Sequence, residues 1–186
     1  TDGAITPDAL QALQDLQDAG LPVVAITGRP VGWSEPFALR WPVNAIVAEN
    51  GSVALVRQQG TLVRHYLQDA DTRHRNQARM QAVAQQVVRE VPGAMLATDS
   101  AGRETDIAVD HSEFTQLPPD AIAHVVRIMQ AAGMTATVSS IHINGWFGDH
   151  NKLVGARWIV RQLWGRALDD ELPGWVYVGD STNDQR

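Results

Sequence analysis

Apolar residues along the chain follow two kinds of pattern. Three leucines recur at helical spacing between Thr6-Pro7, which favours a helix start, and Gly20, which favours a helix end, and so predict a helix over residues 6–20. Three short apolar runs, 21–26, 45–48 and 175–178, are continuous and predict strands buried on both faces of a parallel sheet. Each run ends at a polar turn that contains glycine, which is where open α/β sheets collect their ligands.

The middle of the chain has a different order of patterns. It predicts, in sequence, a strand at 61–67, a helix at 71–91, a strand pair at 94–98 and 105–109, a helix at 118–132, and a strand pair at 134–138 and 141–146. This repeated order of helix, strand and strand indicates a compact α+β domain inserted into an α/β core. We therefore assign residues 1–58 and 148–186 to the core and residues 59–147 to the insertion.

Composition limits the class of protein. The chain has 186 residues, 44% of them hydrophobic, and a formal charge of −6, which predicts a globular protein. No apolar run approaches the roughly 18 to 20 residues that span a bilayer, and no basic stripe offers a surface for nucleic acid. The absence of cysteine excludes disulfides and thiolate metal ligands and is typical of a cytoplasmic protein. These properties favour a small anion as the partner.

Lys152 is the only lysine among 15 basic residues. Apolar residues repeat at helical spacing after it, and residues 149–151 offer candidate N-caps, so Lys152 falls in the first turn of a predicted helix. A cation there opposes the helix dipole by about 0.3 to 1 kcal/mol unless an anion shares the site. Lys152 therefore either reflects a composition biased towards arginine or binds a small anion.

Two further turns carry groups suited to a metal or a phosphate. The segment Gly179-Asp180-Ser181-Thr182-Asn183-Asp184 places two carboxylates and an amide beyond a predicted strand, and such oxygen ligands suit Mg²⁺. Asp, Ser and Asn are also ordinary turn formers, so a surface turn is the alternative. Thr27-Gly28 follows another predicted strand and offers a hydroxyl and a backbone N–H to a phosphoryl oxygen.

Together these motifs resemble those of the haloacid dehalogenase (HAD) superfamily of phosphatases, in particular the branch with a type IIB cap that includes the Cof-like and sucrose-phosphate phosphatases. The resemblance rests on Ile26-Thr27-Gly28-Arg29-Pro30, on Ala48-Glu49-Asn50-Gly51, on Lys152 and on residues 179–184. It implies an α/β fold, with a Rossmann-like core, a parallel sheet and an inserted α+β cap of the C2B type. It also implies a phosphatase that acts with Mg²⁺ on a small phosphorylated metabolite, such as a sugar phosphate, and it indicates no particular oligomeric state.

The resemblance further implies which residues form the site. Phosphate and substrate would be bound by Thr27, Gly28, Arg29, Asn50, Lys152 and Asn183, and Mg²⁺ by Asp180 and Asp184. Lys152, Thr27 and Asp180 would act in catalysis. Thr27 would bind a phosphoryl oxygen, Lys152 would neutralise the charge of the phosphoryl group, and Asp180 would bind Mg²⁺ directly. Arg29 either contacts the substrate or anchors the cap, and Asn50 either contacts the substrate or supports its own turn. Trp33 and Trp146 flank the insertion and either stack on a sugar ring or pack in the protein interior.

One motif of the family is missing from the sequence. The first motif, Asp-x-Asp-Gly-Thr, carries the nucleophilic aspartate, and Asp2-Gly3 lies too close to Thr6 to be its remnant. We expect the sequence to be part of a longer protein in which this aspartate precedes Thr1 and forms an aspartyl-phosphate that water hydrolyses. Two alternatives are a phosphomutase of the same branch and a catalytically silent domain with a binding or regulatory role.

Overall fold

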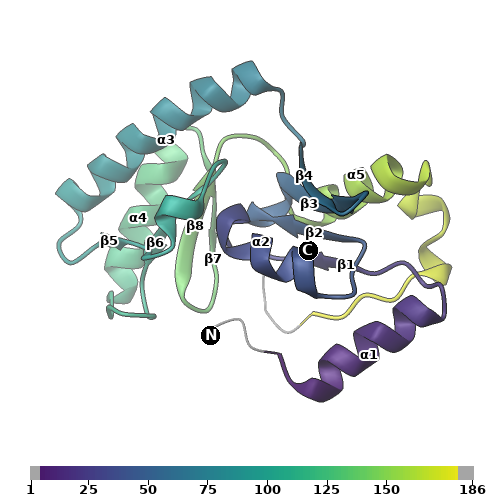
Figure 1. The fold of residues 1–186 in the computed structure, drawn as a ribbon. Helices are drawn as coiled ribbons and strands as arrows, with labels where there is room; N and C mark the ends of the chain where they lie inside the picture. The colour runs from purple at the N-terminus through teal and green to yellow at the C-terminus, as the bar shows by residue number, and fades with distance from the viewer. Residues whose placement is uncertain (1–4, 180–186) are drawn as a thin grey trace.

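The computed structural model describes residues 5–179, which form two units that each contain a four-stranded sheet (Figure 1). The first sheet has the order β1-β2-β3-β4 and the second has the order β5-β6-β8-β7. The strands are β1 (Val24–Ile26), β2 (Ala45–Ala48), β3 (Val53–Gln58), β4 (Thr61–Tyr66), β5 (Met95–Leu96), β6 (Ile107–Asp110), β7 (Thr135–Val138) and β8 (His142–Trp146). The helices are α1 (Pro7–Asp18), α2 (Val31–Arg40), α3 (Ala70–Glu90), α4 (Pro119–Ala131) and α5 (Lys152–Trp164), with short 3-10 turns η1 (Glu49–Gly51), η2 (Ser100–Gly102), η3 (Leu168–Asp170) and η4 (Leu172–Gly174).

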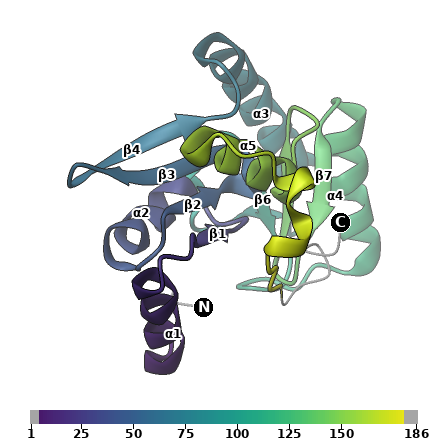
Figure 2. The same cartoon turned by 90° about the vertical axis from the view of Figure 1, so that its right-hand side faces the viewer.

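The first unit is a layered α/β structure. Strands β1 and β2 are parallel, whereas β3 and β4 continue the sheet in antiparallel fashion. Successive residues of a strand point to opposite faces, so Ile46 packs with α2 on one face and Val47 packs with α5 on the other. Figure 2 shows α5 lying across the sheet. The predicted α/β core with parallel strands is therefore confirmed.

The second unit, from α3 to β8, is an α+β structure with both helices on one face of its sheet (Figure 1). Val109 of β6 and Ile143 of β8 join the apolar core beneath α3 and α4. The alternation of strand residues places polar side chains on the opposite face, which we call the polar face. It consists of Asp106, Asp110, His142 and Asn144, all of which are buried.

Helix α2 lies where the sequence predicted only a loop between two strands. Gly32 and Pro36 lie within it, and both residue types have a low helix propensity, so the local sequence does not predict a helix. Its inner face is nevertheless regular, because Val31, Ser34 and Ala38 are buried at helical spacing against the first sheet. Tertiary packing thus stabilises a helix that the local sequence disfavours.

The predicted strand at 175–178 is wrong. This segment is extended without strand pairing, and Val176 and Val178 are 89% and 88% exposed. A strand is stable only when its backbone groups pair with a neighbour, and within residues 5–179 this segment has no partner strand. Strand β1 is an edge strand of the first sheet and is half-buried, so the expectation that both of its faces are buried is also wrong.

The N-terminal helix forms as predicted but contributes little to the core. Thr6 is the N-cap of α1 and accepts a 3.3 Å hydrogen bond from the backbone of Ala9. No residue of α1 is buried, and Leu10 and Leu16 are exposed. The local signals of helix start and stop are therefore sufficient to predict this element, whereas, among the residues described, only Leu13 of its apolar face packs against the core of the first unit.

The change from one sheet to the other falls later than the predicted boundary at residue 58. Strand β4, which we assigned to the insertion, pairs with β3 along its whole length and so extends the first sheet. The two-domain division of the chain stays a prediction. Within residues 5–179, no helix is long and apolar enough to cross a membrane.

Helix α5 and the turn η1 approach each other closely at two glycines. A Cβ atom added to Gly155 of α5 would lie 2.5 Å from the Cα of Gly51 in η1, so the helix rests directly on the backbone of the turn. We predict that Gly155→Ala lowers the free energy of unfolding by about 1 to 3 kcal/mol through overpacking. Gly174→Ala is the matched control, because nothing lies within 4 Å of its added Cβ. Urea denaturation measures both, and an equal, small loss in the two variants would contradict the packing argument.

Candidate active site

The turn after β1 and the turn after β2 are joined at the carboxyl edge of the first sheet. The N–H of Thr27 donates to Val47 O at 2.8 Å, and the N–H of Asn50 donates to Thr27 O at 3.2 Å. The hydroxyl of Thr27 accepts a 3.1 Å hydrogen bond from the Arg29 N–H. A Cβ atom at Gly28 would lie 3.0 Å from the side-chain oxygen of Asn50, so the absence of a side chain lets these two turns meet. Thr27, Gly28 and Asn50 therefore lie together at this edge.

The start of α5 lies at the same edge. Asn151 is the N-cap and accepts a 2.9 Å hydrogen bond from the Val154 N–H, which makes Lys152 the first helical residue as predicted. A Cβ atom on Gly51 would lie 2.2 Å from the carbonyl oxygen of Asn151, and Gly51 has a φ of +109°, so only glycine fits this contact. The backbone thus brings Lys152 next to the turn that contains Asn50.

Glu49 connects this edge to the second unit, and the sequence analysis did not assign it to the site. Its side chain is fully buried, and its carboxyl oxygens accept hydrogen bonds from the backbone of Val31, Glu104 and Thr105 and from the Thr105 hydroxyl. Burial, together with the nearby charge of Asp106, raises the pKa of Glu49 to about 7. This carboxyl group therefore titrates near neutral pH.

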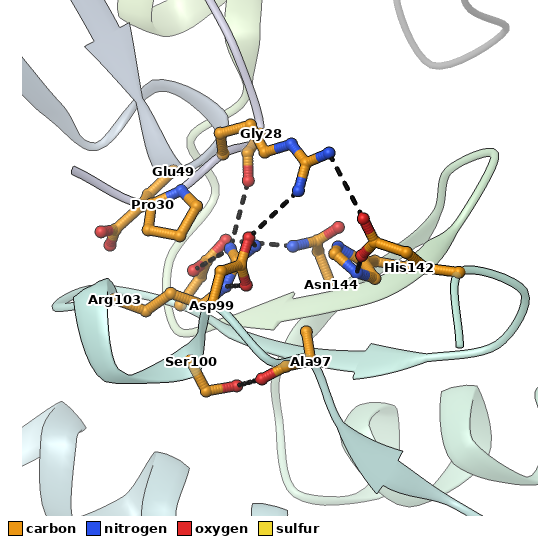
Figure 3. A network of polar contacts seen from close by, with 12 residues as sticks. Gly28, Pro30, Glu49, Ala97, Asp99, Ser100, Arg103, His142 and Asn144 are labelled. Atoms are coloured by element: carbon orange, nitrogen blue, oxygen red, sulfur yellow. Dashed lines mark hydrogen bonds and ion pairs between the residues drawn. The ribbon is translucent and has the colours of Figure 1, made fainter. Parts of the chain in front are cut away.

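A second set of contacts joins Gly28 and Asn50 to the polar face. Figure 3 shows the part of it that Gly28, Arg103 and Asn144 form. Arg103 donates to Gly28 O at 3.1 Å and to the carboxylate of Asp106 at 2.8 Å. Asn50 donates to the same carboxylate at 3.0 Å, and Asn144 donates to it at 3.3 Å. Burial raises the pKa of Asp106, and the neighbouring Arg103 opposes that rise. Asp106 is thus the central acceptor of a buried network that spans both units.

Arg29 also links the two units. Its guanidinium lies 3.3 Å from the carboxylate of Asp99 and 3.7 Å from that of Glu113. Glu113 in turn contacts His142 of the polar face at 2.8 Å. The guanidinium carbon lies 5.4 Å from the ring centre of Trp33, in the range of a cation–π contact. Of the two roles proposed for Arg29, these contacts support anchoring of the second unit.

The described structure therefore brings together part of the predicted site. Thr27, Gly28, Arg29 and Asn50 meet at one sheet edge, and the start of α5 brings the backbone of Lys152 to the same edge. Asp180, Asn183 and Asp184 lie outside the described residues, and residues 5–179 contain no group of three or more acidic, histidine or cysteine residues in position to hold a metal ion. Trp146 is 1% exposed and packs against His150, so stacking on a substrate is excluded for it in this structure.

A sheet with polar turns at its carboxyl edge, covered by an α+β unit whose polar face points towards those turns, defines a capped, Rossmann-like α/β fold. Residues 1–100 match the family model of haloacid dehalogenase-like hydrolases, and the chain belongs to this family. The resemblance inferred from the motifs is thereby confirmed. No curated protein sequence matches the chain.

Solved structures share the fold at low sequence identity. A Thermoplasma acidophilum protein has a TM-score of 0.71 at 12% identity, over 90% of this chain and 67% of that one. The sucrose-phosphatase of Synechocystis has a TM-score of 0.67 at 16% identity, over 97% of this chain and 72% of the enzyme. The C-terminal domain of a Candida albicans trehalose synthase regulatory protein has a TM-score of 0.59 at 16% identity, over 91% of this chain and 59% of that domain. These likenesses concern the fold.

The network at the polar face predicts a large effect of a single substitution. The side chain of Arg103 is 2% exposed, and its loss leaves the buried charge of Asp106 without its cation. We expect Arg103→Met to lower the free energy of unfolding by about 3 to 5 kcal/mol. Arg89→Met is the control, because the Arg89 side chain is 68% exposed and its ion pair contributes at most about 1 kcal/mol. Thermal or urea denaturation measures the difference, and similar losses in the two variants would contradict the role given to Arg103.

Proposed function

We propose that this protein is a phosphatase that hydrolyses the phosphate monoester of a small metabolite. The observation that carries this proposal is the Thr27–Arg29 turn, which follows a parallel strand and faces a buried surface of hydrogen-bonding side chains. Such a turn supplies donors for phosphoryl oxygens, and the opposite surface fixes its position through the hydrogen bond from Arg103 to Gly28 O. Membership of a hydrolase family supports the same reaction class.

The residues at the sheet edge have complementary roles in this proposal. The Thr27 hydroxyl accepts from the Arg29 N–H and retains its own proton, which it donates to a phosphoryl oxygen. The Gly28 N–H donates to a second oxygen, and the Lys152 ammonium neutralises the charge that the phosphoryl group carries. Asn50 supports the turn and Asn183 orients the phosphate or Lys152. The nucleophile is the aspartate of the family's first motif, which has no counterpart in this sequence.

We further propose that Mg²⁺ serves the reaction and that Asp180 and Asp184 hold it. Two carboxylates beside an amide match the oxygen ligands that Mg²⁺ prefers, with water and phosphate oxygens completing its coordination. When bound, the ion would supply positive charge to the phosphoryl oxygens. Lys152 shares that task from the start of α5.

A sugar phosphate is the substrate class that we propose. The similar sucrose-phosphatase was solved with sucrose and phosphate, which supports this choice. The absence of cysteine supports a cytoplasmic location.

Two other functions are distinguished by the same assay. A phosphomutase would need a bisphosphate activator, whereas a phosphatase releases inorganic phosphate without one. A catalytically silent domain is supported by the likeness to a regulatory protein. It would show no turnover under any condition.

We predict that the full-length protein releases phosphate from at least one sugar phosphate and that chelation of Mg²⁺ abolishes the release. A colorimetric phosphate assay over a panel of sugar phosphates, with Mg²⁺ and with EDTA, measures this. Turnover that persists in EDTA would contradict the metal requirement, and an inactive full-length protein would favour the silent domain.

We predict that Lys152→Ala lowers kcat by at least about a hundredfold and leaves the fold intact, because the variant removes a cation that stabilises the transition state. Arg157→Ala on the same helix is the control, since the Arg157 side chain is 44% exposed and pairs with Asp169 at the surface. Steady-state kinetics and circular dichroism measure both variants. Near-normal turnover by Lys152→Ala would refute the assignment of Lys152.

A further inference from the structure

Glu49 has an unusual backbone for its residue type. Glu49 and Asn50 have φ values of 48° and 58°, so two consecutive residues other than glycine adopt left-handed conformations. Each such residue costs on the order of 1 kcal/mol and persists only where the surroundings hold it. In this turn the strained backbone directs the Glu49 side chain into the contact between the two units, where it is fully buried.

The carboxyl group of Glu49 binds one donor from the first unit and three from the second. The N–H of Val31 donates to Oε1 at 2.9 Å, at the start of α2, where no other side chain caps the helix. The N–H of Glu104 contacts both carboxyl oxygens at 3.1 Å. The N–H and hydroxyl of Thr105 lie 2.6 Å and 2.5 Å from Oε2. One side chain therefore ties α2 to the segment that precedes β6.

This segment carries the other contacts between the units. Residues 99–106, which we call the docking loop, contain Asp99 and Arg103 as well as Asp106, and these side chains contact Arg29, Gly28 and Asn50. Glu49 binds the same loop, because its carboxyl group accepts hydrogen bonds from the backbone N–H groups of Glu104 and Thr105. Loss of the Glu49 contact would therefore weaken the hold on this loop, whereas the contacts of Asp99, Arg103 and Asp106 would remain.

The surroundings accommodate the carboxyl group with and without its proton. The Ser52 hydroxyl lies in a short contact with that of Thr105 and donates to Glu49 O at 3.0 Å. When Glu49 is protonated, it can donate to Thr105, Thr105 to Ser52, and Ser52 to the Glu49 carbonyl. When Glu49 is ionised, the Thr105 hydroxyl donates to it instead. Proton binding thus changes the charge of the contact without removing its hydrogen bonds.

We propose that Glu49 is a positioning residue that helps to hold the docking loop over the Thr27–Arg29 turn and that holds this loop less tightly as the pH rises through neutrality. The positioning rests on the geometry alone. Its consequence for turnover rests on the proposed function.

The sign of the pH effect follows from the pKa of Glu49. Burial in the contact, together with the nearby charge of Asp106, raises this pKa from the ordinary value of 4.5 to about 7, so the docked state binds a proton more tightly than a state in which Glu49 is exposed to water. The full contribution to docking is present below pH 4.5, is lost progressively as the pH rises to about 7, and is absent above that. Charged groups also lie on the elements packed around Glu49, namely Arg29, Glu35, Arg64, Asp99, Arg103, Glu104, Asp106 and Lys152.

Amide hydrogen exchange tests this proposal without any assay of activity. We expect the protection factors of the Glu104 and Thr105 amides, after correction for intrinsic exchange, to fall at least tenfold between pH 5 and pH 8. In Glu49→Gln, which carries no titratable proton, they should be constant over this range. Glu90→Gln, at the end of α3, is the control and should behave as the unsubstituted protein does.

Constant protection in the unsubstituted protein would overturn the proposal, and this measurement needs no variant to fold. A pH dependence in Glu49→Gln equal to that of the unsubstituted protein would overturn it as well. If the protein is a phosphatase, KM should rise with pH between 5 and 8 in the unsubstituted protein and not in Glu49→Gln. An inactive protein would contradict the proposed function and leave the exchange result in force.

Discussion

The arrangement of the whole molecule depends on the buried polar contact between the turn at Glu49 and Asn50 and the docking loop. Buried polar groups are costly unless each finds its partner, and a charge removed from water costs more than a neutral group. In this contact the carboxylates of Glu49 and Asp106 each accept several hydrogen bonds from the opposite unit or from their own. Such a contact is specific, because a small displacement would leave several groups without partners at once.

The geometry of the candidate site depends on this contact and on close backbone approaches that glycine residues permit. The Thr27–Arg29 turn, the turn at Glu49 to Gly51 and the start of α5 come from distant parts of the sequence. Gly28 permits the Thr27–Arg29 turn to touch the turn at Glu49 to Gly51. Gly51 and Gly155 permit the start of α5 to approach that second turn. The docking loop then encloses the same edge.

Much of the fold could be predicted from local sequence patterns. The helices α1, α3, α4 and α5 follow from apolar spacing and from caps such as Thr6 and Asn151, because these signals act over a few residues. The parallel pair of β1 and β2 follows from continuous apolar runs. Helix α2 could not be predicted, because its stability comes from burial against a sheet and not from its own residues. The segment 175–178 shows the reverse case, since an apolar run forms a strand only where a partner is present.

The site could be predicted only where a motif marked it. The family motifs give Thr27, Gly28 and Lys152 a role. Glu49 lies in one of these motifs but has no role assigned by it, and Arg103 and Asp106 lie in none of them. Asn50 and Asp106 are 56 residues apart, and a sequence without structure does not show that their side chains meet. The alternation of polar residues in β6 and β8 is the one local signal of the polar face, and it gives no indication that this face is buried.

The hydrogen bond between Asn50 and Asp106 is the most direct point at which to test whether the two units are joined as described. A double-mutant cycle with Asn50→Ala, Asp106→Ala and the combined variant gives the coupling energy of the pair from urea denaturation. We predict a coupling energy of at least about 1 kcal/mol, which is in the range found for residues in one hydrogen-bond network. Additive effects, within about 0.3 to 0.5 kcal/mol, would contradict the joined arrangement of the two units.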